Sequence, residues 1–195
     1  MKNTFILASS SKYRQKILKT LINDFQSISP NINETPLKNE SAKALVKRLA
    51  YTKAKAIRVK SKNTIVIASD QCAIHNGNII GKPANKNSAI EQLKSFSGQS
   101  IIFLTSLCVI NFQSRETIEE IDEFTVHFRV LSDQEIISYI DKEMPLDCAG
   151  SFKSEGLGIS LFNKLEGEDF NALIGLPIIK LNKILIKMGI NALTD

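Results

Sequence analysis

The amino-acid sequence predicts an α/β fold built on one mixed β-sheet. Residues 64–68 are rich in β-branched side chains and residues 101–112 form a long apolar run, so we expect both to be buried strands. Segments with apolar residues at helical spacing alternate with these strands along the chain. Asn76-Gly77 lies between two short apolar stretches and is the strongest hairpin signal in the sequence. An antiparallel hairpin makes the sheet mixed rather than purely parallel.

The first third of the chain predicts two helices and one strand. A short apolar run over residues 5–8 leads into Ser9-Ser10-Ser11, which is typical of a helix N-cap, and a helix is expected over residues 12–22. Residues 25–29 alternate like a strand. A long helix follows over about residues 41–59, with apolar residues along one face.

The alternation of helices and strands continues to the end of the chain. Ser132 and Glu135 form a capping box that opens a helix, and Pro177 suits the first position of a last helix that runs to Met188. Asp70, with its neighbours, is expected to end or interrupt the strand that begins at residue 64. The other expected elements are a helix over residues 87–95, strands over 101–112, 124–131 and 159–165, and a polar loop over 148–158.

Length and composition indicate a single globular domain over residues 1–195. Of the 195 residues, 43% are hydrophobic and 23% charged, which excludes disorder and low complexity. No apolar run approaches the roughly 18 residues of a membrane-spanning helix, and the first apolar stretch is too short for a signal peptide. We therefore expect a cytoplasmic protein with no membrane partner.

The charges are unevenly distributed along the chain. Residues 1–62 carry fourteen Lys and Arg against three Asp and Glu, whereas the remainder carries eleven against seventeen. Such a basic segment could bind nucleic acid, but aromatic residues are not interleaved with the charges and no known nucleic-acid module matches. We expect no nucleic-acid partner, and expect that a few of these cations bind a smaller anion.

Lys53 is the first residue whose type conflicts with its position. It lies four residues after Leu49 and seven after Val46, on the apolar stripe of the helix expected over 41–59. One interpretation is a lysine at the edge of the stripe that extends its charge to solvent. The other is an inward cation, which requires an anion.

Ser9 and Arg14 are candidates for binding phosphate. Serine hydroxyls, free backbone N–H groups and the positive end of the dipole meet at the start of a helix and favour an anion. Arg14 in the first turn is unfavourable for the dipole unless an anion offsets it. The alternative is an ordinary serine cap beside a surface arginine.

Three further residues could contribute to a site. Asp70 is a carboxylate at the end of an apolar run, which is costly unless it is paired, bound to metal or used to cap backbone N–H groups. Lys82 lies between Gly81 and Pro83, where a cation with little steric cover suits a phosphate contact. Glu34 is either a further carboxylate ligand for a metal or only a charged residue on a loop.

Taken together, these segments resemble the Maf family of nucleoside triphosphate pyrophosphatases. The resemblance covers nearly the whole chain in the right order and implies an inosine-triphosphatase-like fold, with a mixed twisted sheet flanked by helices and a central cleft. Lys12 and Tyr13 stand where the family usually has Pro before its Arg-containing pair. The matching stretches are Leu7–Arg14, Glu34-Thr35-Pro36, Leu49-Ala50, Lys53-Ala54, Asp70, Gly81-Lys82-Pro83, Ser97-Gly98, Ala149-Gly150 and Gly175-Leu176-Pro177.

The resemblance implies that a nucleoside triphosphate is hydrolysed between its α- and β-phosphates to a monophosphate and pyrophosphate. A divalent cation, magnesium or manganese, would assist. Asp70 would activate water, and Glu34 would help Asp70 to hold the metal. The residues that would neutralise the triphosphate are Ser9, Arg14, Lys53 and Lys82.

Finer features resemble the 7-methyl-GTP pyrophosphatase group of the family, which implies a house-cleaning role against modified nucleotides. These features are Ser69-Asp70-Gln71 and the stretch from Cys148 to Gly156. The N1–H and N2–H₂ donors of guanine match a carboxylate such as Glu155, and methylation at N7 makes the ring cationic. Tyr13 could supply an aromatic face for that cation, and Gln71 could bond to the base or sugar.

Other functions stay open at this stage. The chain could be a dTTP or UTP pyrophosphatase of the same family, or a nucleotide-binding regulator of septation with little hydrolysis. The resemblance also implies a homodimer, although no periodicity in the sequence marks an interface.

Overall fold

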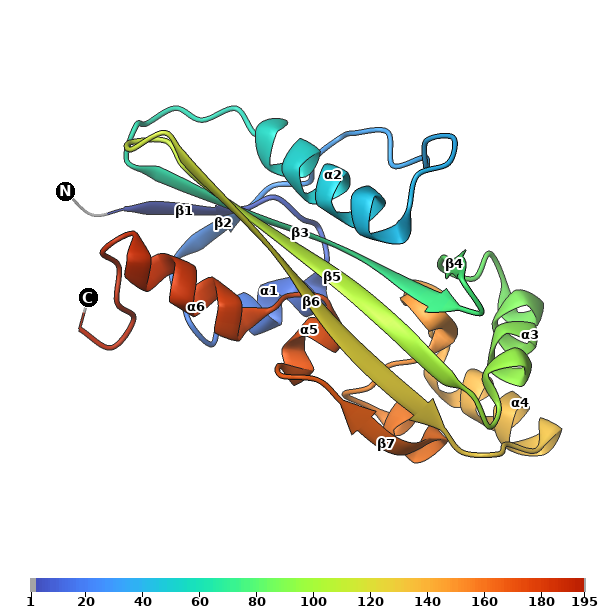
Figure 1. Ribbon diagram of the computed structural model, residues 1–195. Coiled ribbons are helices and arrows are strands. Elements are labelled where there is room, and N and C mark those ends of the chain that lie inside the picture. Colours follow the sequence, from blue (N-terminus) through green and yellow to red (C-terminus); the bar gives the residue numbers. More distant parts are fainter. Residues whose placement is uncertain (1–2, 195) are drawn as a thin grey trace. The chain divides into compact units, whose positions relative to one another are not determined.

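A computed structural model of the protein describes residues 3–194, which form two compact units (Figure 1). The first unit contains residues 3–70, 105–122 and 169–194, and the second contains residues 71–104 and 123–168. The prediction of one domain over residues 1–195 stays a prediction. Three strands begin in one unit and end in the other: β3 (Thr64–His75), β5 (Ser100–Asn111) and β6 (Glu116–Phe128).

The sheet is mixed, as predicted. β1 (Thr4–Leu7) pairs in parallel with both β2 (Phe25–Ser27) and β3. The order of strands among the described residues is β2-β1-β3-β5-β6-β7, where β7 spans Phe162–Glu166, and β4 (Asn78–Ile80) lies beside β3. The hydrogen-bonded pairs β3–β4 and β6–β7 are antiparallel.

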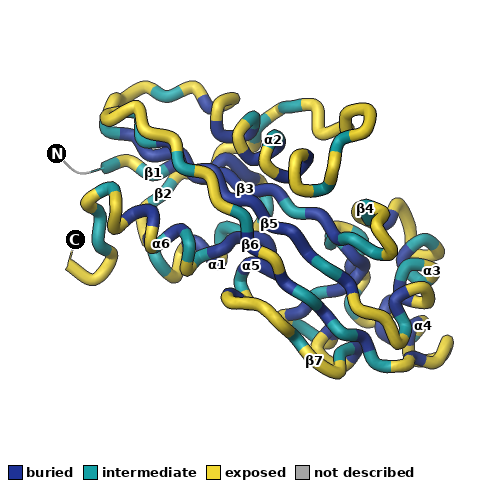
Figure 2. The backbone as a smooth tube through the Cα atoms, in the orientation of Figure 1, coloured by how far each residue is buried: buried dark blue, intermediate teal, exposed yellow. Residues whose placement is uncertain are grey.

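Helices cover both faces of the sheet in the first unit. α2 (Ala42–Lys55) lies on one face, and α1 (Lys12–Leu18) and α6 (Ile178–Lys187) lie on the other (Figure 1). A short helix, α5 (Phe170–Ile174), precedes α6. Figure 2 shows that the strands between these layers are largely buried, whereas the connecting loops are exposed.

The alternation of side chains along β3 determines which of its residues face α2 and which face α1 and α6. Ile65 and Ile67 pack with residues of α1 and α6, whereas Val66 and Ala68 pack with residues of α2. Successive residues of a strand point to opposite faces. Ser69 therefore belongs to the face covered by α1 and α6, and Asp70 belongs to the face covered by α2.

In the second unit the predicted hairpin is confirmed. β4 (Asn78–Ile80) pairs with the end of β3, and Asn76 and Gly77 adopt positive φ angles of 49° and 76°. This is the backbone that a two-residue hairpin turn requires, and Asn-Gly supplies it with little strain. β7 (Phe162–Glu166) pairs with β6 on the other side.

Two helices complete the second unit. α3 (Lys86–Phe96) begins after Asn85, whose side chain accepts a hydrogen bond from the backbone of Ser88. α4 (Asp133–Glu143) begins with the predicted capping box of Ser132 and Glu135. The loop over 148–158 contains a 3-10 turn, Ala149–Ser151, and leads into a second 3-10 segment, Leu157–Leu161.

Several boundaries differ from those predicted. β3 does not end at Asp70 but continues to His75, and β6 begins at Glu116 rather than near residue 124. The strand expected over 159–165 begins only at Phe162 because a 3-10 turn precedes it.

The helices also differ in length from the predicted ones. α1 and α2 end four residues earlier than expected, at Leu18 and Lys55. α5 was not predicted, because five residues are too few to show a helical period. Within residues 3–194, none of the helices has the length and apolar character that crossing a bilayer requires.

Candidate active site

Lys53 lies between two carboxylates at the centre of the candidate site. Its Nζ is 2.6 Å from Asp70 Oδ1 and 3.0 Å from Glu34 Oε1. Lys53 and Asp70 are each only 6% exposed, whereas the Glu34 side chain retains 56% of its exposure. We call Glu34, Lys53 and Asp70 the charged cluster. It joins a buried ion pair to a carboxylate that reaches solvent.

The inner pair of the charged cluster is positioned by α2 and β3. Lys53 continues the buried face of α2 that Val46 and Leu49 begin, so it is an inward cation rather than a lysine extended to solvent. Asp70 lies on the α2 face of β3. A buried ammonium is stable only with partners, and the carboxylate of Asp70 provides one.

Ser106 connects α2 to β3 by hydrogen bonding beside the Lys53–Asp70 pair. Its hydroxyl, which is 1% exposed, lies 2.6 Å from the carbonyl oxygen of Val46 and 3.3 Å from that of Asp70, and it can donate to either. Ser106 lies in β5 on the same face of the sheet as Asp70. This contact links the helix that carries Lys53 to the strand that carries Asp70.

Glu34 lies on a loop that α2 holds through Arg48. The guanidinium of Arg48 donates to both carboxylate oxygens of Glu40, at 2.6 and 2.7 Å, and to the carbonyl oxygen of Thr35 at 3.2 Å. The hydrogen bond to Glu40 is the largest of the effects that lower the pKa of that carboxyl to about 2. Arg48 thereby ties the segment next to Glu34 to the helix that carries Lys53.

The environment of Asp70 raises its pKa above the ordinary value for aspartic acid. Burial is the largest cause, because it disfavours the charged form, and Glu34 adds a smaller effect in the same direction. Lys53, by its charge and its hydrogen bond, and Arg14, by its charge, lower the pKa but do not cancel the effect of burial. Asp70 is thus a carboxylate that accepts a proton more readily than one in water.

The opposing effects on Asp70 predict shifts of opposite sign in two variants. Lys53→Met removes a cation that favours the ionised form, so the pKa of Asp70 should rise. Glu34→Gln removes a like charge, so the same pKa should fall. Carboxyl carbon chemical shifts followed by NMR in the metal-free protein would measure both. Shifts of the same sign would contradict this assignment of the electrostatic neighbours.

Ser9 and Arg14 lie at the start of α1, as predicted. The hydroxyl of Ser9, which is 5% exposed, accepts a hydrogen bond from the backbone of Ser11. Ser11 is the N-cap, and its hydroxyl accepts from the backbone of Arg14. The first turn of α1 contains no acidic residue.

Arg14 is half-buried and lies within electrostatic reach of the charged cluster. Its Nε donates to the carbonyl oxygen of Gly175 at 2.8 Å. Burial lowers the pKa of Arg14, while the charges of Asp70 and Glu34 act in the opposite direction. Arg14 is therefore bonded to the protein backbone rather than fully extended into solvent. Two cations and two carboxylates meet here, so together they carry no net charge.

The other predicted site residues lie elsewhere in the chain. Tyr13 is half-buried in α1 next to Arg14. Gln71, Lys82 and Glu155 belong to the second unit: Gln71 is half-buried in β3, and Lys82 and Glu155 are exposed on loops. Their membership of one site with Asp70 stays a prediction.

Three buried polar groups of this region were not predicted. Ser69, Thr105 and Ser106 are each at most 1% exposed, and each donates to a backbone carbonyl of a neighbouring segment. Hydroxyl side chains inside otherwise apolar strands were the signal that could have identified them, because a buried hydroxyl needs a partner.

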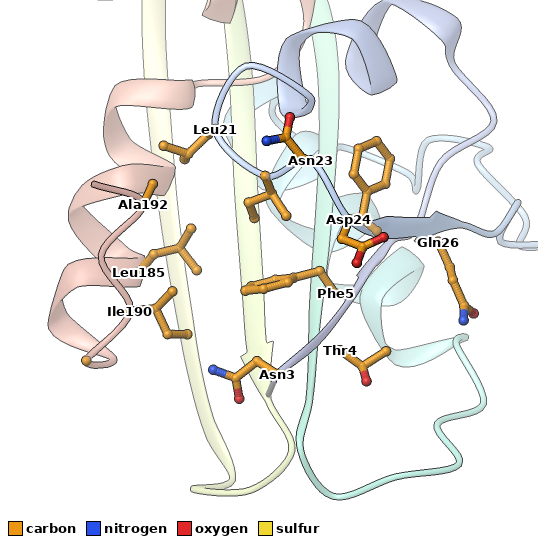
Figure 3. A pocket seen from close by; sticks show the side chains of 13 residues that line it. Asn3, Thr4, Phe5, Leu21, Asn23, Asp24, Gln26, Leu185, Ile190 and Ala192 are labelled. Atoms are coloured by element: carbon orange, nitrogen blue, oxygen red, sulfur yellow. The ribbon is translucent and has the colours of Figure 1, made fainter. Parts of the chain in front are cut away.

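A cavity of about 900 Å³ in the first unit is lined by other residues (Figure 3). Phe5, Leu185 and Ile190 are among its apolar lining residues, and Asn23 and Asp24 are among its polar ones. Its lining includes none of the predicted site residues. The chemistry of the side chains, rather than the volume of this cavity, therefore identifies the candidate site.

A known protein family and several named proteins are similar to this chain. The Maf family model, described as Maf-like protein, matches residues 4–188. A 7-methyl-GTP pyrophosphatase of Vibrio vulnificus is 52% identical over 188 residues, covering 96% of each chain. A protein of the same name from Colwellia psychrerythraea is 50% identical, covering 98% of this chain and 96% of its own.

A solved structure supports the fold. The HAM1 protein of Coxiella burnetii matches with a TM-score of 0.52 at 13% sequence identity, covering 95% of this chain and all of its own. The predicted fold class, an α/β sheet of mixed direction flanked by helices, is confirmed. With a match along almost its whole length and relatives at half identity, this chain belongs to the Maf family.

Proposed function

We propose that the protein hydrolyses 7-methyl-GTP between its α- and β-phosphates, releasing 7-methyl-GMP and pyrophosphate. The reaction class and substrate rest on the relatives named 7-methyl-GTP pyrophosphatase at about half identity. The observation in this chain that supports hydrolysis most directly is the buried carboxylate of Asp70, whose pKa is raised, beside the cation of Lys53. A protein that only binds nucleotide has no need of such a base.

In the proposed mechanism Asp70 takes a proton from a water molecule as the water attacks one of the two phosphorus atoms that flank the bond. The bond from that phosphorus to the bridging oxygen breaks, and the bridging oxygen leaves with the other phosphorus. A carboxylate whose pKa is raised above the ordinary value removes a proton more effectively than ordinary aspartate. Ser9, Arg14, Lys53 and Lys82 stabilise the negative charge that develops on the phosphate oxygens.

A divalent cation, magnesium or manganese, fits the charged cluster. Magnesium is commonly held by one or two carboxylates together with substrate phosphates, and Asp70 and Glu34 converge on one point at Lys53. Residues 3–194 contain no group of three His, Cys, Asp or Glu that would hold a metal without substrate. When bound, the cation would polarise the phosphate oxygens and add positive charge to a cluster that has none in excess.

A panel of nucleoside triphosphates tests the proposed function. Pyrophosphate release from 7-methyl-GTP, GTP, dTTP and UTP should be fastest for 7-methyl-GTP, with no orthophosphate formed. Faster release from dTTP or UTP would assign the chain the other specificity of the family. Binding without release from any of the four would favour a nucleotide-binding regulator.

Glu155 is proposed to recognise the base, so Glu155→Gln should affect 7-methyl-GTP selectively. Loss of a charged hydrogen-bond acceptor should lower kcat/KM for 7-methyl-GTP by about ten- to a hundredfold, with dTTP and UTP changed by less than about threefold. Glu168, another exposed glutamate of the second unit, provides the control variant Glu168→Gln. Equal losses on all three nucleotides would remove Glu155 from base recognition; Tyr13 and Gln71 would then remain as candidates.

A further inference from the structure

One backbone carbonyl receives hydrogen bonds from two side chains near the charged cluster. The oxygen of Gly175 accepts from Arg14 Nε and from Ser69 Oγ, each at 2.8 Å. Ser69 is fully buried, and Gly175 is buried as well. A carbonyl oxygen has two lone pairs, so both donors can be satisfied at once.

The segment that presents this carbonyl is itself fixed. One carboxylate oxygen of Asp169 accepts from the backbone of Asn171 at the start of α5, and the other accepts from the backbone of Ile179 in the first turn of α6. The hydroxyl of Thr105 donates to the carbonyl oxygen of Ala172. These hydrogen bonds connect α5 to α6 and to β5. They fix the backbone on both sides of Gly175.

Gly175 occupies a backbone conformation that favours glycine. Its φ angle is 130°, and a Cβ atom there would lie 3.3 Å from Arg14 Nε. The absence of a side chain therefore allows the guanidinium to approach the backbone closely.

The fixed carbonyl determines which groups of Arg14 remain for an anion. Its bond to Nε sets the direction of the guanidinium plane, and within residues 3–194 no protein acceptor is bonded to the two terminal Nη groups. Those two groups form the fork that binds a phosphate at two oxygens.

We propose that Ser69 is a positioning residue that acts through the Gly175 carbonyl to hold Arg14 for phosphate binding. This inference rests on the proposed function, because its kinetic test measures hydrolysis of 7-methyl-GTP. Ser69 does not touch substrate; its hydroxyl fixes the acceptor that orients Arg14. Its effect must therefore depend on Arg14 being present.

A double-mutant cycle of Ser69→Ala and Arg14→Ala tests this dependence. Ser69→Ala should lower kcat/KM for 7-methyl-GTP by about tenfold in the parent protein and by less than about twofold in the Arg14→Ala background. The reason is that the effects of two substitutions in one hydrogen-bond network are not additive. Thr64→Val is a matched control, since it removes another buried hydroxyl of β3 that donates to a backbone carbonyl, that of Ser61. It should leave kcat/KM within about twofold of the parent.

A second variant and a second readout keep the two proposals separable. Gly175→Ala places a Cβ against Arg14 Nε and should show the same dependence on Arg14, even if Ser69→Ala fails to fold. If the parent releases no pyrophosphate from any nucleotide, the proposed function fails, and the same cycle is then measured on the Kd of inorganic tripolyphosphate. Equal fold-losses with and without Arg14 would overturn the positioning role of Ser69 in whichever readout is used.

Discussion

Asp70→Asn should abolish nearly all pyrophosphate release while nucleotide binding persists. Asparagine keeps the size of the side chain but cannot take a proton from water, and the loss of a general base lowers rates by about 10²–10⁴-fold. We therefore expect kcat to fall by about a thousandfold, roughly 4 kcal/mol of barrier. The Kd for 7-methyl-GTP, measured by calorimetry, should change by less than about threefold.

The protein offers a closely matched control for this variant. Asp122 is also buried, at 2% exposure, and its Oδ2 lies 2.9 Å from Lys180 Nζ, so it repeats the Asp–Lys pair away from the charged cluster. Asp122→Asn should retain activity wherever the protein remains folded. Turnover of Asp70→Asn within about tenfold of the parent, a difference of about 1.4 kcal/mol, would show that Asp70 is not the base.

Lys53→Met should have the second largest effect. It removes a buried cation beside Asp70, so both the stabilisation of the phosphate charge and the ionised form of the base are weakened. Losing one preorganised charge-stabilising donor typically lowers kcat by about 10²–10³-fold, and we expect a loss of kcat/KM in this range for 7-methyl-GTP. Steady-state kinetics with thermal unfolding of the same samples would measure it.

Two further variants distinguish the effect of where the charge lies from the effect of having a charge at all. Lys47→Met removes a lysine from the exposed face of the same helix and should leave kcat/KM within about twofold. Lys53→Arg keeps the charge but presents it as a planar fork, so part of the activity should return. If Lys47→Met and Lys53→Met lose activity equally, the general charge of the helix, and not the buried position of Lys53, is responsible.

Local patterns were sufficient to predict most of the fold. The apolar stripe of α2, the Asn76-Gly77 turn and the capping box of α4 are each determined by residues close in sequence, and each is confirmed. The course of β3 through Asp70 could not be predicted in this way. A carboxylate in a strand is tolerated only because Lys53, far away in the sequence, neutralises it.

β6 and α5 show two other limits of sequence patterns. The first part of β6 is mostly exposed and rich in glutamate, so its residues have the polar composition of a loop. The strand forms because neighbouring strands supply hydrogen bonds, which composition does not reveal. α5 contains only five residues and is fixed by Asp169 and by Thr105 of β5.

The candidate site could be predicted only in part, because local patterns mark single residues but not the contacts between distant segments. Lys53 conflicted with its apolar stripe, and of the two interpretations which that conflict left open, the structure confirms the inward cation with anionic partners. The family resemblance suggested Glu34 and Asp70, and the structure brings both to Lys53. A hydroxyl inside an apolar strand indicates that Ser69 and Ser106 need hydrogen-bond partners, but the partners lie on distant segments, so local patterns do not identify the Gly175 and Val46 carbonyls.

Product analysis of 7-methyl-GTP turnover, run side by side on the parent protein and Asp70→Asn, tests the central claim most directly. The parent should yield 7-methyl-GMP and pyrophosphate in equal amounts, and Asp70→Asn should yield almost none of either at saturating nucleotide. Formation of 7-methyl-GDP with orthophosphate, or equal yields from both proteins, would contradict the claim that this chain uses Asp70 to cleave between the α- and β-phosphates.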